Sequence, residues 1–138
     1  VVVFNEMIHD ARIVPMDGRP HLPPNIRPLL GDSRGRWDGD TLVIETTNFT
    51  DRTRFRGSDE NLRLIERFTR TGADTLMYEF TLDNPTAFTS RWTAAYPMAR
   101  SDEHMYEYAC HEGNYGLQNM LTSARFADKA AEDAAKKK

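Results

Sequence analysis

Alternating hydrophobic and polar residues are the clearest pattern in this chain, and they predict β-strands. In segment 75–82, apolar residues occupy every second position, which is the period of a strand with one buried face. Further segments of this kind lie at 41–47, 62–70, 88–98 and 105–111, and most of the connections between them are short. Five strands spaced about ten residues apart predict a mainly β fold, an antiparallel up-and-down meander that forms either a barrel or a curved sheet.

The two ends of the chain predict different elements. Residues 1–7 and 11–16 are rich in β-branched and apolar side chains, so we expect an N-terminal hairpin that turns within 5–10. After Gly113 and Gly116 the period becomes helical, with apolar residues at Leu117, Met120, Leu121, Ala124, Ala127 and Ala131. We therefore expect an antiparallel β domain over 1–114, then a C-terminal helix and charged tail over 115–138. The first half of the helix is expected to pack on the sheet.

A segment rich in proline and glycine separates the predicted hairpin from the first strand of the meander. Residues 17–36 contain four Pro and three Gly, a density that argues against any regular element. A structureless segment of this length is unusual inside a compact domain. We therefore expect a long Pro-rich arm that is either functional or packed against a partner.

One face of the predicted sheet is apolar and aromatic. Alternation assigns these residues to it: Leu42, Ile44, Leu64, Phe68, Leu76, Tyr78, Phe80, Leu82, Trp92 and Tyr96. This face is either a core or the lining of a cavity. Its aromatic members Tyr78, Phe80, Trp92 and Tyr96 are the candidate residues for binding an apolar or carbohydrate ligand.

Glu66 shares this apolar face, which is unusual for a carboxylate. A buried carboxyl group has a raised pKa and is a candidate acid or ligand anchor, so Glu66 joins the candidate ligand-binding residues. The alternative is a structural ion pair with an arginine.

The opposite face carries charges whose sign alternates from strand to strand. In chain order these are Glu45, then Arg63 and Arg67, then Glu79, Arg91 and Glu107. If sequential strands are neighbours, each carboxylate faces a guanidinium, a contact that contributes about 0.2–1 kcal/mol. Chance placement in a chain with 28% charged residues is the alternative.

Composition narrows the functional classes. A chain of 138 residues with a net charge of −3 is one domain without the basic excess typical of nucleic-acid binding. No apolar run approaches the roughly 20 residues of a membrane span, so none is predicted. Cys110 is the single cysteine, which excludes an internal disulfide.

Two groups of polar residues are weaker candidates for chemistry. His9, Asp10, His111 and Glu112 would form an acid–base or metal site if the fold brought them together. The zinc-peptidase motif is absent, because position 115 is Tyr where a second His is needed. The alternative is that 111–116 organises a junction between a strand and the helix.

Asp38 and Asp40, with Asp32 and Asp51 nearby in sequence, are candidate oxygen ligands for calcium. Their spacing does not match an EF-hand loop, and an ordinary Asp-Gly turn is the alternative. No other cofactor is predicted. Asn48-Phe49-Thr50 fits the N-glycosylation triplet, which has meaning only in an exported protein.

Three segments carry a resemblance. The run 35–49, together with 65–68 and 108–112, resembles a large family of uncharacterised exported proteins of soil and freshwater bacteria such as acidobacteria. This resemblance implies an extracytoplasmic location and a natural chain with an upstream region, and it assigns no catalytic residue. The expected meander is also similar to lipocalin-like barrels, an architectural analogy that transfers no function.

These observations lead to three functional hypotheses, and they favour a noncatalytic role. The first is a binding module whose aromatic face holds an apolar or carbohydrate ligand. The second is a structural subunit of an extracellular homo-oligomer or filament, in which Val1, Val2, Val3 and Phe4 and the Pro-rich arm contact another protomer. The third is a hydrolase that uses His9, Asp10, His111 and Glu112.

Overall fold

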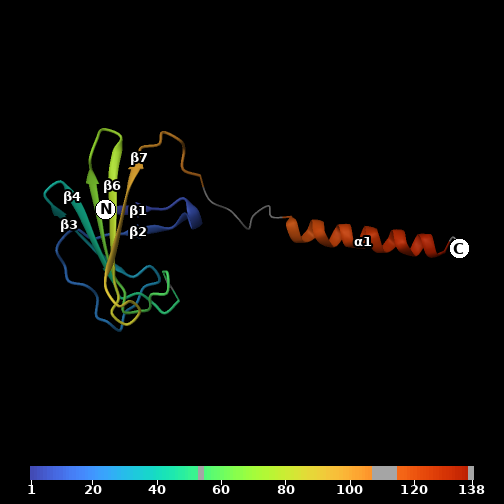
Figure 1. Ribbon diagram of the computed structural model, residues 1–138, viewed down its shortest axis with the longest axis horizontal. Coiled ribbons are helices and arrows are strands. Elements are labelled where there is room, and N and C mark those ends of the chain that lie inside the picture. Colours follow the sequence, from blue (N-terminus) through green and yellow to red (C-terminus); the bar gives the residue numbers. More distant parts are fainter. Residues whose placement is uncertain (53–54, 107–114, 137–138) are drawn as a thin grey trace.

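The computed structural model describes residues 1–52, 55–106 and 115–136, and its largest element is a five-stranded antiparallel sheet (Figure 1). Its strands are β3 (Asp32–Asp38), β4 (Thr41–Thr47), β5 (Arg63–Arg70), β6 (Thr75–Asp83) and β7 (Trp92–Ala99). Each strand pairs with the next one along the chain, which confirms the predicted meander. Because β3 and β7 are the two edges, the sheet is open, and the curved-sheet form of the prediction is the correct one.

The N-terminal hairpin forms a second sheet. Strands β1 (Val2–Phe4) and β2 (Ala11–Ile13) pair antiparallel, as predicted, and a short 3₁₀ turn, η1 (Met7–His9), lies between them. The hairpin crosses the strands of the larger sheet (Figure 1). The chain that continues from β2 lies directly on β3, where the Gly35 amide donates a hydrogen bond to the Pro15 carbonyl at 2.9 Å.

Strand β3 corrects the prediction that 17–36 contains no regular element. Gly31 and Gly35 contributed to that prediction, yet both are compatible with the strand. Gly31 has φ +73° and ends the irregular segment directly before the strand begins. Gly35 lies inside the strand, where a Cβ atom would overlap the Met16 sulfur. A glycine is therefore needed at this close approach of two segments. The name Pro-rich arm is used below for 17–31.

The apolar face of the larger sheet is the predicted one. Phe68, Tyr78 and Tyr96 are neighbours across β5, β6 and β7, as are Leu64, Leu82 and Trp92. The main buried cluster lies at one end of this face and consists of Phe49, Leu62 and Leu82, against which Leu64, Phe80, Phe88 and Trp92 pack.

Two predictions for the C-terminal region have different outcomes. The helix is present as α1 (Gly116–Ala135), but its apolar residues do not pack on the sheet: Leu117, Met120 and Leu121 are exposed, and so is Phe126 at 71%. Helical spacing defines an apolar side without specifying what covers it. None of the helices in the described part of the chain has the length and apolar character of a membrane span.

The predicted strand at 105–111 is wrong where the structure describes it, because Met105 and Tyr106 belong to no strand. The remaining residues of that segment, including Cys110, lie outside the described residues.

Candidate functional site

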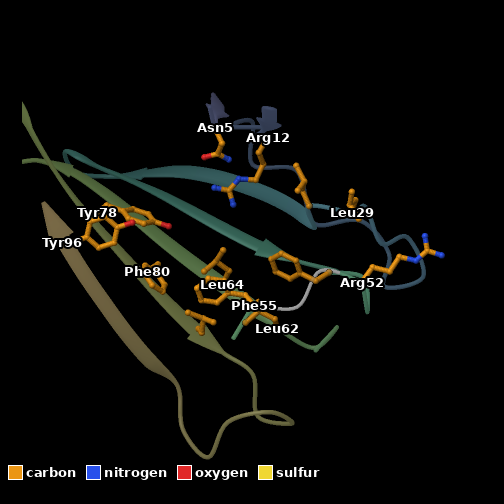
Figure 2. A pocket seen from close by; sticks show the side chains of 13 residues that line it. Asn5, Arg12, Leu29, Arg52, Phe55, Leu62, Leu64, Tyr78, Phe80 and Tyr96 are labelled. Atoms are coloured by element: carbon orange, nitrogen blue, oxygen red, sulfur yellow. The ribbon is translucent and has the colours of Figure 1, made fainter. Parts of the chain in front are cut away.

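An open cavity of about 750 Å³ lies between the N-terminal hairpin and the apolar face of the larger sheet (Figure 2). Its volume falls within the range of small-molecule sites in proteins. Most of the lining side chains are apolar; the full set is Asn5, Arg12, Leu29, Leu30, Phe49, Arg52, Phe55, Leu62, Leu64, Tyr78, Phe80, Leu82 and Tyr96.

Four segments that are distant in sequence supply this lining. Strands β5 to β7 supply the floor through Leu64, Tyr78, Phe80, Leu82 and Tyr96, which lie on one face because strand side chains alternate. The hairpin contributes Asn5 and Arg12 on the other side of the cavity, as Figure 2 shows. The Pro-rich arm and the connection from β4 to β5 supply the remaining residues.

A buried ion pair joins the hairpin to the floor. Glu66 is 4% exposed, and Arg12 Nη2 lies 2.6 Å from its Oε2, without the geometry of a hydrogen bond. The Tyr78 hydroxyl donates to Glu66 Oε1 at 2.8 Å, and Arg12 Nη1 donates to the Thr46 hydroxyl at 3.4 Å. The structural ion pair considered for Glu66 is therefore present, and two of its neighbours, Arg12 and Tyr78, line the cavity.

Tyr78 is held in its neutral form. Burial raises the pKa of the Tyr78 phenol well above its usual value, and the adjacent Glu66 carboxylate raises that pKa further. A neutral phenol that donates to Glu66 keeps its oxygen lone pairs available as acceptors. Tyr78 can therefore accept a hydrogen bond from a ligand, but it is no base at neutral pH.

The predicted aromatic residues form a continuous row. Tyr78 packs edge-on against Tyr96 with ring centroids 5.3 Å apart, and lies 5.7 Å from Phe80. Phe80 in turn contacts Phe55 at 6.1 Å and Trp92 at 5.8 Å. Trp92 does not line the cavity, and its ring packs edge-on against Phe80.

On the polar face, the Pro-rich arm is attached to its own sheet through Asp32. The Leu22 amide donates to Asp32 Oδ2 at 2.9 Å, His21 Nδ1 lies 2.8 Å from the same oxygen, and Arg34 donates to Oδ1 at 2.6 Å. Burial would raise the pKa of Asp32, but these donors outweigh it and the pKa is lowered. The arm thus contacts its own sheet at Asp32.

The predicted charge pairing is present in part. Arg63 forms a two-pronged ion pair with Glu45 at 2.8 and 2.9 Å, and Arg63 hydrogen bonding lowers the pKa of Glu45. Arg67 lies opposite Glu79 in the register, but its ion pair is with Asp38 at 2.9 Å. Within the described ranges, no group of three or more His, Cys, Asp or Glu side chains is arranged to hold a metal ion.

A smaller groove of about 370 Å³ lies beside β1. The predicted assembly residues Val1, Val2 and Val3 line it, together with Trp37, Asp40, Leu42, Phe68, Arg70 and Leu76. Val2 is 59% exposed, and Phe4 is also exposed. β1 pairs with β2 alone among the described strands, so assembly through its outer edge stays a prediction.

Neither of the described catalytic candidates, His9 and Asp10, lines the cavity. His9 lies in the turn of the hairpin, where its ring packs edge-on against Phe4 with centroids 4.6 Å apart. The Asp10 carbonyl accepts a hydrogen bond from the Asn5 amide. His111 and Glu112 lie outside the described residues, so the hydrolase stays a prediction.

Several residues of the site were missed from the sequence, and Arg12 is the most informative. It lies in β2 two residues before Val14, which directly follows the strand and is 1% exposed, so Arg12 is a cation that alternates with a buried apolar residue, just as Glu66 is an anion on an apolar face. Opposite charges on two apolar faces predict that these faces pack together. Phe49, Phe55, Leu29 and Leu30 lie in irregular segments, where no period reveals them.

Comparisons with protein-family models, with curated proteins and with solved structures each gave no match. The fold and site define the protein's class only as an open antiparallel meander with a hairpin-covered apolar cavity.

Proposed function

We propose that this protein is a noncatalytic binding module whose hairpin-covered cavity takes an apolar small molecule. The observation that carries this proposal is the cavity of about 750 Å³, lined by two tyrosines, three phenylalanines and five leucines. An apolar patch left open to water is unfavourable by about 25 cal/mol per Å², and a ligand that covers it recovers that free energy.

The composition of the lining favours an apolar ligand over a carbohydrate. Asn5, Arg12, Arg52 and the two tyrosine hydroxyls are the only polar side-chain groups in the lining that the structure describes. A sugar that entered would lose water from many hydroxyl groups, each at a cost of about 1–3 kcal/mol where no partner replaces it.

The test is a titration with N-phenyl-1-naphthylamine, a neutral apolar dye that fluoresces when it leaves water. We expect saturable binding to the wild type. Leu64→Gln is expected to weaken it by about 1–2 kcal/mol, because a leucine in contact with the ligand is replaced by a polar side chain. Circular dichroism checks that each variant is folded.

Ile65→Gln is the matched control, because Ile65 is the next residue of β5 and points to the opposite face. It is expected to bind the dye as the wild type does. Absence of binding to the folded wild type, or equal weakening by the two variants, contradicts the proposed function. Maltose in excess is expected to leave the dye in place; displacement by maltose would favour a carbohydrate ligand instead.

A further inference from the structure

The charges around the cavity carry information about the ligand beyond its apolar character. Two positively charged residues, Arg12 and Arg52, line the cavity. No aspartate or glutamate belongs to the described lining. The cavity therefore presents cations to its contents. These two cations have very different surroundings.

The charge of Arg12 is already compensated. Its Nη2 lies 2.6 Å from Glu66 Oε2, and both side chains are largely buried. An anionic ligand group placed beside Arg12 would also lie beside the Glu66 carboxylate. Repulsion between like charges at such a site opposes binding there.

Arg52 is in the opposite situation. Its guanidinium forms no hydrogen bond or ion pair within the described part of the chain, whereas its backbone amide is bonded to Thr50. Arg52 lies at the far end of the cavity from Tyr78 and Tyr96 (Figure 2). An arginine at the edge of an apolar site can lay its aliphatic stem along the site and keep its charged group in water. Its planar donors suit a carboxylate or another oxyanion.

We propose that the cavity takes an amphiphile with one anionic head group, whose apolar body covers Leu64 and Phe80 and whose head group pairs with Arg52. This inference rests on the proposed function and names its ligand class. The apolar floor binds the body of the ligand, and the charge of Arg52 sets the preference between ligands of equal length and different head groups.

The test compares dodecanoate with 1-dodecanol, both used to displace N-phenyl-1-naphthylamine from the protein at neutral pH. We expect dodecanoate to bind about three- to fivefold more tightly than the alcohol, which is the upper part of the range for an exposed ion pair. We expect this preference to shrink as the salt concentration rises from roughly 0.01 M to 0.15 M, because salt screens exposed charges.

Arg52→Gln is expected to bring dodecanoate to the affinity of the alcohol and to leave the alcohol unchanged. Arg36→Gln is the matched control, because it removes the same charge from an exposed residue of β3 that does not line the cavity. It is expected to retain the preference. Equal reduction by both variants would show a general effect of net charge and would overturn the assignment to Arg52.

The outcomes separate this inference from the proposed function. If the dye binds but dodecanoate and 1-dodecanol compete equally in the wild type, the anionic head group is wrong and the apolar binding module stands. If the dye does not bind the folded wild type, the binding module is wrong and the head-group assignment fails with it.

Discussion

At the scale of single residues, Asp32 shows how a buried charge is stabilised by three neighbouring residues. Asp32 is the first residue of β3. Its carboxylate is bonded to His21 and Leu22 of the Pro-rich arm and to Arg34 of its own strand. Hydrogen bonds to a charged group contribute about 1.5–3 kcal/mol each, more than those between neutral groups. Asp32 therefore attaches an otherwise irregular segment to the edge of the sheet.

This arrangement predicts a particular dependence of stability on pH. The folded-state pKa of Asp32 lies below its ordinary value of 3.8, so its stabilising contribution is complete above that value and is lost as the pH falls through the lower, folded-state pKa. Asp32→Asn is expected to lower the free energy of unfolding by about 1–2 kcal/mol at pH 7. We expect the difference from wild type to narrow below pH 3.8 in urea titrations.

Asp102→Asn is the control, because Asp102 forms an exposed ion pair with Arg100. Exposed pairs contribute little, so this variant is expected to follow the wild type throughout. A gap between Asp32→Asn and wild type that stays constant from neutral to acidic pH contradicts the role given to Asp32.

At the scale of elements, an ion pair and a close contact are among the interactions that position the hairpin on the sheet. Arg12 reaches Glu66 from β2, and Met16 packs where β3 has Gly35 in place of a side chain. A two-stranded hairpin is marginally stable on its own, so these contacts with the larger sheet keep it in place. Because the hairpin supplies one wall of the cavity, its attachment also determines the shape of the site.

Removing the arginine is expected to leave a buried carboxylate without its cation. Arg12→Met keeps the bulk of the side chain and is expected to lower the free energy of unfolding by about 3 kcal/mol. Glu66→Gln in the same chain is expected to restore much of that loss. Urea unfolding of both single variants and the double variant forms the cycle that isolates the coupling between the two residues.

Arg19→Met is the matched control, because Arg19 is an exposed arginine paired with Asp17. Its effect is expected to stay below about 0.5 kcal/mol. If the double variant is as unstable as the sum of the two single variants, the ion pair does not position the hairpin.

Some elements could be predicted from the sequence because their signals are local. Period-two alternation identified β4, β5 and β6 almost to the residue, and the short connection between β5 and β6 indicated that these two strands are neighbours. Strand β3 was missed because it contains Gly35, a residue type that usually weakens strands but here allows a close approach of Met16. The exposure of Phe126 on α1 was missed for a related reason: helical spacing carries no information about tertiary partners.

At the scale of the whole molecule, the site follows from the way the meander, the hairpin and two irregular segments come together. Alternation revealed the floor, including Tyr78, Phe80 and Tyr96, because those residues lie on regular strands. The lining residues outside the strands were missed, because residues such as Leu29 and Arg52 lie where the sequence has no hydrophobic period. A ligand site formed between elements depends on long-range packing, which local patterns do not encode.

The central claim is that the hairpin-covered cavity holds an apolar ligand. The most direct measurement is the change in backbone amide NMR shifts when ¹⁵N-labelled protein is saturated with N-phenyl-1-naphthylamine. We predict the largest changes at Phe49, Leu64 and Phe80, which line the cavity. Changes confined to Trp37 and Leu42 would place the dye in the smaller groove, and they would contradict the claim, as would the absence of any change.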